Sequence, residues 1–371
     1  MIGFLEERHV ALRYRAQAWV DAADLEHDHD PRRLVERMAR HALLQACVPA
    51  EHGGLRERVE LRDLAVLRSV LAYRSSFADT MFAMQGLGSY PVTLAGTLTQ
   101  KRALLPRVVN GQTICAFAIT EPDAGSDVSA IRTRAVPDGD DYIIDGVKCF
   151  ISNAGVADSY VLFARTSDDR HRGLSAFVLD GGATGLTTEP IELIAPHPIG
   201  TMRLQQVRVP ASARLGQEGD GFALAMATLD FFRTSVGAAA LGMAARALDE
   251  ARARVLQRRQ FGRPLAEFQA TQMAIAEMAV DVAAARLLVF SAAHHIDTTE
   301  TPGSVDAAMA KLYATEAAQR VIDRAVQLFG GQGVVAGCIV ERLYREVRAL
   351  RIYEGTSEIQ KLVIGKALLR T

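Results

Sequence analysis

The sequence predicts a multidomain α+β protein: an N-terminal helical domain over residues 1–111, a central β-barrel or sandwich over 112–215, and a C-terminal four-helix bundle over 216–371. Apolar residues recur at helical spacing in the first and last segments, whereas the middle segment holds short apolar runs separated by turn residues. A chain of 371 residues with 49% hydrophobic residues is long and apolar enough for two or three such cores.

The N-terminal segment is predicted to be helical throughout. Apolar residues spaced by about 3.6 positions favour helices over 32–46, 61–72 and 99–108. Glycine and proline interrupt this pattern, so helix breaks are expected at Pro49, Gly53, Gly54, Pro91 and Gly96.

The central segment is predicted to contain only short strands. A Pro-Asp-Gly-Asp turn at 137–140 precedes one of the clearest runs. Short strands with turns between them are typical of a small barrel or sandwich. The strands are expected at 114–120, 141–148, 160–165, 174–179, 186–194 and 201–209.

The helical pattern returns near Gly219 and continues to the end of the chain. Ser304 is the expected cap of one long helix, and Gly330 is its expected C-terminal stop. The last helix is predicted to begin at Ser357, because Ser357 and Gln360 have the spacing of a capping box. The three long helices are expected at 222–258, 268–295 and 304–329.

Composition and charge exclude several classes of protein. The formal net charge is −1 and no run of Lys and Arg appears, so a nucleic-acid partner is not expected. The four cysteines form no CxxC pair, and the His-Asp-His-Asp run at 27–30 has no evident third ligand, so neither disulfides nor a metal site is expected. Charges replace the apolar part of a secretory signal, and no run reaches the ~18 apolar residues of a membrane span, so a cytoplasmic protein is predicted.

Near the C-terminus, Glu354 is a candidate general base. Gly355 permits a sharp turn and close approach of a ligand, and Tyr353 can cover the carboxylate with apolar surface. Desolvation raises a carboxyl pKa from its reference of about 4.3, which makes a glutamate a usable base near neutral pH. The alternative is a surface glutamate favoured by the dipole of the following helix.

The loop 120–127 and Arg258 are candidates for contact with a phosphate-bearing ligand. The loop 120–127 follows a predicted strand and can expose N–H groups as an anion-binding nest, although an ordinary polar turn is the alternative. The glycine-containing run 327–333 closes a helix instead of opening one, so it is not a nicotinamide-type dinucleotide fingerprint. Arg258 can pair with a phosphate, or simply complement the dipole at a helix end.

Taken together, these segments resemble the acyl-CoA dehydrogenase family. The resemblance covers nearly the full length, and its motifs occur in the order that the family has. It is carried by the segments 118–127 with Ala130, 258–262, 327–333 continuing to Arg342 and Glu346, and 352–360.

The resemblance implies an FAD site between the β-domain and the C-terminal bundle. In the β-domain, the implied FAD contacts are Phe117, Ile119, Thr120, Gly125, Ser126, Phe150, Ile151 and Ser152. In the bundle, they are Arg258, Gln260, Phe268, Gln269, Gln327, Gly330, Gly331, Thr356 and Glu358. Five of these match positions that reach a neighbouring subunit's FAD: Phe268, Gln269, Gln327, Gly330 and Gly331. This match implies a homo-oligomer, usually a tetramer.

The resemblance also implies the chemistry. Glu354 matches the base that removes a proton α to a thioester carbonyl while the β-hydrogen passes as hydride to flavin N5. Some members carry the base on the first long bundle helix, but here that position is Phe232, which cannot act as a base. The implied substrate contacts are Ser126, Asp230, Arg233, Tyr353 and Gly355.

The predicted function is therefore conversion of an acyl-CoA to a trans-2-enoyl-CoA in fatty acid or amino acid catabolism, with electron-transfer flavoprotein as the implied electron acceptor. Phe231 and Phe232 add bulk beside the expected acyl pocket, which favours a short, branched or cyclic acyl group. Two prolines stiffen the segment 195–201, where many members have a longer Arg-containing loop, so an acyl-carrier-protein thioester is an alternative substrate. A thioester oxidase and, less favoured because of Glu354, a flavin monooxygenase on the same fold are further alternatives.

Overall fold

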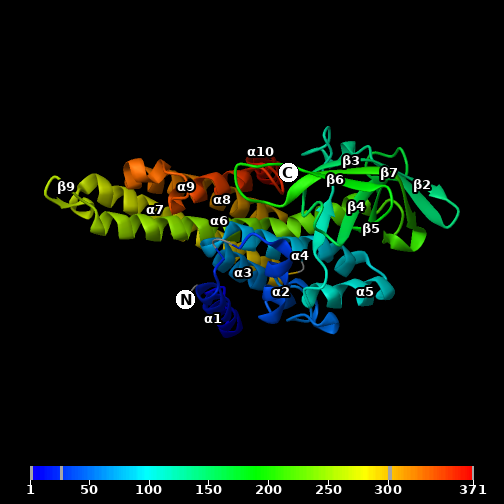
Figure 1. Ribbon diagram of the computed structural model, residues 1–371, viewed down its shortest axis with the longest axis horizontal. Helices are drawn as coiled ribbons and strands as arrows, with labels where there is room; N and C mark the ends of the chain where they lie inside the picture. Colours follow the sequence, from blue (N-terminus) through cyan, green and yellow to red (C-terminus); the bar gives the residue numbers. More distant parts are fainter. Residues whose placement is uncertain (1–2, 26–27, 300–302, 370–371) are drawn as a thin grey trace. The chain divides into compact units, whose positions relative to one another are not determined.

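A computed structural model describes residues 3–25, 28–299 and 303–369, which form two compact units (Figure 1). The bundle unit comprises the segments Met1–His27, Leu61–Asp79 and Asp230–Thr371. The sheet unit comprises Asp28–Glu60 and Thr80–Leu229. Each unit therefore combines segments that are distant in the sequence. The division into three domains at 111 and 215 stays a prediction.

Long helices form the bundle unit, and α6, α7 and α8 run side by side (Figure 1). A Cβ on Gly237 of α6 would lie 3.0 Å from Val289 of α7 and 3.3 Å from the backbone of Ala310 of α8, so glycine permits this close approach. The helices of the unit are α1 (Glu7–Ala22), α3 (Leu61–Arg74), most of α6 (Gly221–Gln257), α7 (Gln269–Thr298), α8 (Ser304–Phe329), α9 (Ile339–Val347) and α10 (Ser357–Leu368).

The sheet unit contains one eight-stranded sheet with the order β6-β7-β3-β2-β4-β5-β8, and β1 pairs in parallel with β4. Strand β3 extends to Ser152, beyond its predicted end. The turn predicted at 137–140 is shorter than expected, because Asp138 pairs directly with Asp141 and Pro137 therefore belongs to β2. The strands are β1 (Cys115–Ala118), β2 (Arg134–Asp138), β3 (Asp141–Ser152), β4 (Ser159–Arg165), β5 (Leu174–Asp180), β6 (Leu186–Pro190), β7 (Ile199–Pro210) and β8 (Arg214–Leu215).

Helix α4 (Ser76–Ala95) packs directly on β1. A Cβ on Gly88 would lie only 2.7 Å from the Cβ of Cys115, so only glycine fits at this contact. Gln85 completes the contact, because its Nε2 donates to Thr113 O (2.7 Å) and its Oε1 accepts from Cys115 N (2.8 Å). Helix α4 thus holds the strand that leads into the loop 120–127.

Two expected helix boundaries are wrong. Pro91 does not break a helix but lies buried inside α4, where packing of neighbours such as Val92 outweighs the lost backbone hydrogen bond. The helix expected at 32–46 is α2 (Pro31–Arg40), followed by a short 3-10 helix, Leu44–Cys47. Helix α5 (Leu98–Val109) agrees with its predicted range.

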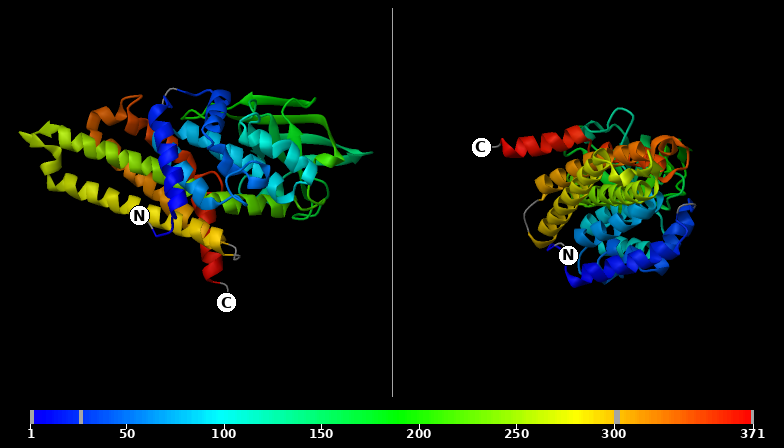
Figure 2. Two further views of the ribbon diagram at one scale, coloured as in Figure 1. Left: turned by 90° about the horizontal axis from the view of Figure 1, so that it is seen from below. Right: turned by 90° about the vertical axis from the view of Figure 1, so that its left-hand side faces the viewer.

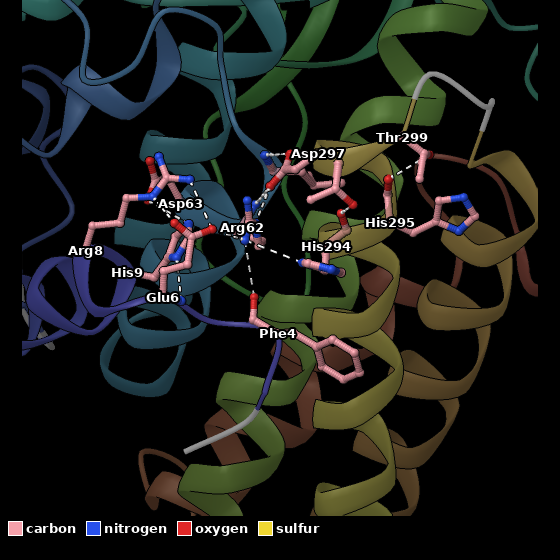
Figure 3. Close-up of polar contacts among 12 residues, drawn as sticks. Phe4, Glu6, Arg8, His9, Arg62, Asp63, His294, His295, Asp297 and Thr299 are labelled. Carbon is pink, nitrogen blue, oxygen red and sulfur yellow. Dashed lines mark hydrogen bonds and ion pairs between the residues drawn. The ribbon is translucent and has the colours of Figure 1, made fainter.

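Ion pairs of the buried Arg62 connect the N-terminal segment, α3 and α7 within the bundle unit (Figure 3). Arg62 donates through Nε to Asp297 Oδ2 (2.9 Å) and through Nη1 to Glu6 Oε1 (2.7 Å). Asp297 also accepts from the backbone N–H groups of Leu61 (2.7 Å) and Arg62 (2.9 Å). Burial raises the pKa of Asp297 despite these bonds, because a carboxylate removed from water loses its solvation.

Among the residues that the structure describes, no helix is long and apolar enough to cross a membrane.

In the run 27–30, His27 lies outside the described residues. Asp28 is 5% exposed and pairs with Arg33 (2.6 Å) and Arg37 (2.7 Å), so these ion pairs account for its burial.

Candidate active site

The turn that carries Glu354 has a strained backbone. Glu354 and Gly355 both adopt left-handed conformations, with φ of 51° and 89°. Glycine adopts such a φ freely, whereas a residue with a side chain is strained there by roughly 1–3 kcal/mol. The turn lies between the short helix Arg348–Arg351 and α10. Strain of this kind is concentrated at functional sites, where surrounding contacts maintain it.

Side chains from α8 and α10 hold this turn. Gln360 Nε2 donates to the carbonyl oxygens of Glu354 (3.3 Å) and Gly355 (2.8 Å). Lys311 Nζ donates to the same Gly355 oxygen at 2.7 Å. Both donor side chains belong to residues that are 0% exposed, so the turn is fixed from the interior of the bundle unit.

Helix α10 begins at Ser357 as predicted, but the predicted capping box is wrong. Thr356 is the N-cap, and its hydroxyl accepts from Ile359 N (3.3 Å). Ser357 is the first helical residue, and its Oγ donates to Glu316 Oε1 (2.6 Å). Gln360 bends back to the strained turn and therefore cannot complete the box.

The carboxyl group of Glu354 is suited to accept a proton. Glu354 as a whole keeps intermediate exposure, but its Oε2 is buried and has no hydrogen-bond partner among the described residues. Burial raises the pKa of Glu354 above its usual value. Cations of Arg68, Lys311 and Arg233 oppose this shift, and the carboxylate of Asp79 adds to it. A carboxylate with a raised pKa and an unused oxygen is a competent general base.

A buried ion pair lies close enough to influence Glu354 electrostatically. Arg68 donates to both oxygens of Asp79 (2.9 and 2.8 Å) and to Ser235 Oγ (2.9 Å). Burial raises the pKa of Asp79 and also that of Tyr353, so the Tyr353 phenol stays neutral. Neither Arg68 nor Lys311 was predicted to belong to the site, because a charged residue on a helix is usually solvated.

The predicted substrate contacts on α6 form a compact polar group. Asp230 and Arg233, which are one helical turn apart, form an ion pair at 2.6 Å. Ser304 donates to Asp230 (2.9 Å) and is the first residue of α8, not its cap, so that prediction is wrong. Phe232 is 2% exposed and packs edge-on against Phe231, with ring centroids 5.5 Å apart. A side chain buried in this way serves the core, in agreement with its exclusion as a base.

In the sheet unit, a buried ion pair anchors the loop 120–127. Glu121 accepts from the backbone N–H groups of Arg132 (2.6 Å) and Thr133 (2.9 Å) and from Lys148 Nζ (2.8 Å). Burial alone would raise the pKa of Glu121, but Lys148 and the N–H donors outweigh it and lower that pKa. Burial lowers the pKa of Lys148 to about 8. The base of the loop is thus fixed from inside while its tip is exposed.

Of the flavin contacts predicted in the sheet unit, some are exposed and others are buried. Phe150 is 58% exposed and adopts φ of 53°, where the pairing of β3 with β7 shifts register. The preceding residue, Cys149, donates its N–H to Thr120 O (2.9 Å), which holds the exposed ring beside the loop. Gly125 and Ser126 are exposed, and a Cβ on Gly125 would meet nothing within 4 Å. An exposed ring beside an open loop fits a flat aromatic cofactor. The side chains of three members are instead buried: Phe117, Ile119 and Ile151.

The other two flavin contacts predicted here, Thr120 and Ser152, have intermediate exposure, and Ser152 has an unexpected partner. Its Oγ lies 2.8 Å from Nε2 of His197, which comes from the proline-containing segment 195–201. Burial lowers the pKa of His197 to about 4, so the imidazole is neutral at physiological pH. This contact was not predicted, because it joins residues 45 positions apart in the sequence.

Most flavin contacts predicted in the bundle unit are exposed. The hairpin of β9 (Arg259–Gln260) and β10 (Arg263–Pro264) joins α6 to α7 at the end of both helices (Figure 2). Phe268, just beyond it, is half-buried under the guanidinium of Arg263, 4.1 Å from the ring centroid. Gly330 ends α8 as predicted. The exposed members are Arg258, Gln260, Gln269, Gln327, Gly330, Gly331 and Glu358.

Three family models match consecutive parts of the chain. They are described as the N-terminal, middle and C-terminal domains of acyl-CoA dehydrogenase and cover residues 7–112, 116–207 and 219–369. The protein therefore belongs to the acyl-CoA dehydrogenase family, a family of FAD-dependent enzymes. The predicted fold class of helical domain, β-domain and helical domain is confirmed.

Curated relatives are similar over most of their length. Cyclohexane-1-carbonyl-CoA dehydrogenase from Geobacter metallireducens is 38% identical over 331 residues, which cover 88% of this chain and 87% of the relative. A short-chain-specific acyl-CoA dehydrogenase from Clostridium acetobutylicum is 38% identical over 344 residues, which cover 92% and 90%.

Solved structures agree over nearly the whole chain. Butyryl-CoA dehydrogenase from Megasphaera elsdenii has a TM-score of 0.94 at 34% identity, covering 99% of both chains. A chain from a structure described as the electron transferring flavoprotein of Acidaminococcus fermentans has a TM-score of 0.94 at 35% identity, also covering 99% of both. The prolyl acyl carrier protein oxidase AnaB has a TM-score of 0.91 at 27% identity, covering 99% of this chain and 100% of that one.

Proposed function

We propose that this protein dehydrogenates an acyl-CoA to a trans-2-enoyl-CoA and that Glu354 is the base. The proposal rests on the environment of the Glu354 carboxyl group. Its pKa is raised by burial, its Oε2 has no hydrogen-bond partner among the described residues, and its backbone is strained. Perturbed titratable groups and strained backbones both concentrate at catalytic sites.

The chemistry of the chain's own residues follows from this assignment. Glu354 takes the α-proton of the acyl thioester, and the β-hydrogen leaves with its electron pair. When bound, FAD supplies the acceptor for that hydride. The backbone N–H of Glu354 is assigned to the thioester carbonyl oxygen, where negative charge develops. The Oε2 oxygen of Glu354 is buried, so this oxygen of the base is shielded from water.

The exposed ring and open loop of the sheet unit support the FAD assignment. Phe150 and Ser152 are assigned to the isoalloxazine, and Gly125 and Ser126 to the phosphate-bearing arm. By the same resemblance, Arg258 and Gln260 are assigned to the pyrophosphate or adenine of FAD. The exposed positions Gln269, Gln327, Gly330 and Gly331 are assigned to the FAD of a neighbouring subunit. These assignments stay predictions.

We infer that the acyl group is short, branched or cyclic. Phe231 keeps intermediate exposure beside buried Phe232, and two relatives are named for cyclohexane-1-carbonyl-CoA and for short-chain substrates. The value of kcat/KM for butyryl-CoA or cyclohexane-1-carbonyl-CoA is expected to exceed that for palmitoyl-CoA by at least about tenfold, the scale of discrimination that a pocket achieves by size. A preference for palmitoyl-CoA would contradict the inference.

An acyl-carrier-protein thioester is the second candidate substrate. Pro196 and Pro198 in the segment 195–201 favour it, as does similarity to a prolyl acyl carrier protein oxidase. The same acyl group, presented on CoA and on a carrier protein, separates the two candidates by kcat/KM. Reoxidation of the reduced enzyme by electron-transfer flavoprotein or by air then distinguishes a dehydrogenase from an oxidase.

We infer that the protein forms a homo-oligomer through α7. Met273, Val280 and Leu287 are 60%, 66% and 53% exposed, and their spacing of seven residues places them on one face. Ala276 and Ala283 are also exposed and complete a heptad pattern on that face. An exposed apolar seam of this length is typical of a surface that another helix covers.

Val280→Glu is expected to dissociate the oligomer, because it places a charge in the middle of the seam. Sedimentation of the FAD-loaded protein would show a shift from tetramer to smaller species. Arg102→Glu, which introduces the same carboxylate on exposed α5, is the control and should leave the mass unchanged. An unchanged mass for Val280→Glu would exclude α7 as the interface.

A further inference from the structure

Lys311 is a buried lysine to which the proposed reaction assigns no step. It is 0% exposed in α8, and its Nζ donates to a backbone carbonyl, Gly355 O, at 2.7 Å. Lysine is seldom fully buried, because its ammonium loses solvation that a neutral acceptor only partly replaces. Such a placement costs stability and therefore points to a functional requirement. The residues one turn away on the same face are buried too: Ala307, Ala308, Ala314 and Thr315.

The hydrogen bond from Lys311 acts on the strained turn. The Gly355 oxygen accepts from both Lys311 and Gln360, so the peptide group that follows the turn has a fixed orientation. With the peptide group held in this orientation, the backbone of the turn has φ of 51° at Glu354 and 89° at Gly355. Two donors on one carbonyl thus help to maintain a backbone conformation that Glu354 would otherwise leave.

Lys311 also differs from the other two cations that act on Glu354 in the direct partner of its charged group. Arg68 is bound by both oxygens of Asp79, and Arg233 by Asp230, so each arginine is compensated by its own carboxylate. Lys311 binds a neutral carbonyl instead. Burial lowers the pKa of Lys311 to about 8, which leaves it mainly protonated at neutral pH. The charged and titratable groups that act on Glu354 or Lys311 come from α3 (Arg68), α4 (Asp79), α6 (Arg233), α8 (Glu316), the turn (Tyr353) and α10 (Glu358).

We propose that Lys311 is a positioning residue for the reaction, whose ammonium fixes the Glu354–Gly355 turn and keeps the Glu354 carboxyl ionised before substrate is deprotonated. The inference rests on the proposed role of Glu354 as the base. Gln360 holds the same carbonyl without a charge, so the two side chains share the geometric role but not the electrostatic one.

The pH dependence of flavin reduction in FAD-loaded variants separates these roles. Flavin reduction requires ionised Glu354, so the reduction rate rises with pH through the Glu354 pKa. Loss of a nearby cation raises that pKa and moves this rising limb of the pH–rate profile to higher pH. For Lys311→Met we expect a shift of about one pH unit, and a rate about tenfold lower on the acid side of the limb. Lys311→Arg should restore the limb, because it keeps the charge. Gln360→Leu should slow reduction without moving the limb.

Lys366→Met, on an exposed position of α10, is the control and should keep the wild-type profile. A wild-type limb in Lys311→Met, or a rate lowered evenly at every pH, would overturn the inference. If Lys311→Met does not fold, Lys311→Gln decides, because it keeps an N–H donor and loses the charge: an unmoved limb again overturns the inference. Failure of the proposed function is distinguishable, because Glu354→Gln would then be reduced as fast as the wild type.

Discussion

Replacing Glu354 with glutamine is expected to lower the rate of flavin reduction by acyl-CoA about 10²–10⁴-fold, the usual contribution of a general base. Glutamine has nearly the same shape but cannot take the α-proton. The buried Oε2 position has no hydrogen-bond partner among the described residues, so no nearby donor has to be rearranged. Rapid anaerobic mixing with substrate measures the rate, and the FAD absorbance of the purified variant shows that the cofactor is retained.

Glu36→Gln, on the exposed surface of α2, is the matched control and should reduce its flavin at the wild-type rate. In the wild type, the rate should rise with pH through the raised pKa of Glu354, because only the carboxylate accepts a proton. Fast reduction in Glu354→Gln would show that another group is the base.

The second large effect is expected at Lys148, below the loop 120–127. Lys148→Met should destabilise the protein by about 3–5 kcal/mol, because it leaves the Glu121 carboxylate buried without its cation. The loop is assigned to the cofactor, so the FAD content should fall as well. Urea unfolding followed by circular dichroism measures the first effect, and FAD per chain after gel filtration measures the second.

Arg132→Ala serves as the control for Lys148→Met. The Arg132 side chain is 78% exposed and pairs with an exposed Asp123, so its loss should cost less than about 1 kcal/mol. The double variant Lys148→Met/Glu121→Gln should recover part of the lost stability, since it buries no unpaired charge. An unchanged unfolding midpoint in Lys148→Met would show that the ion pair does not anchor the loop.

The fold was predictable from the sequence where apolar residues recur at helical spacing over a long stretch. The helices over 268–295 and 304–329 correspond to α7 and α8, because many turns of periodic apolar residues bury a continuous face. Local rules failed where tertiary contacts decide. Pro91 lies inside α4, and Ser357 is the first residue of α10 instead of its cap, because packing and side-chain partners outweigh the local preference for a break or a cap.

A motif singled out Glu354 in the sequence. The structure places it in a strained turn with one buried carboxyl oxygen, and its role as the base stays a prediction. Lys311 and Arg68 were missed because a charged residue on a helix is usually solvated. A signal for both was nevertheless present. Residues one turn before and after Arg68 on its helix, like those around Lys311, are apolar or small, so each charge stands inside an apolar face. The contact between Ser152 and His197 joins the end of β3 to the segment before β7 and has no such local signal.

The most direct test of the central claim is a single anaerobic turnover of the FAD-loaded protein with a short acyl-CoA, unlabelled or deuterated at the α- or β-carbon. The predicted result is bleaching of the visible flavin band, formation of trans-2-enoyl-CoA detected by mass spectrometry, and slower bleaching with deuterium at the α-carbon. Absence of bleaching with every acyl thioester, or bleaching that α-deuteration does not slow, would contradict removal of the α-proton by Glu354.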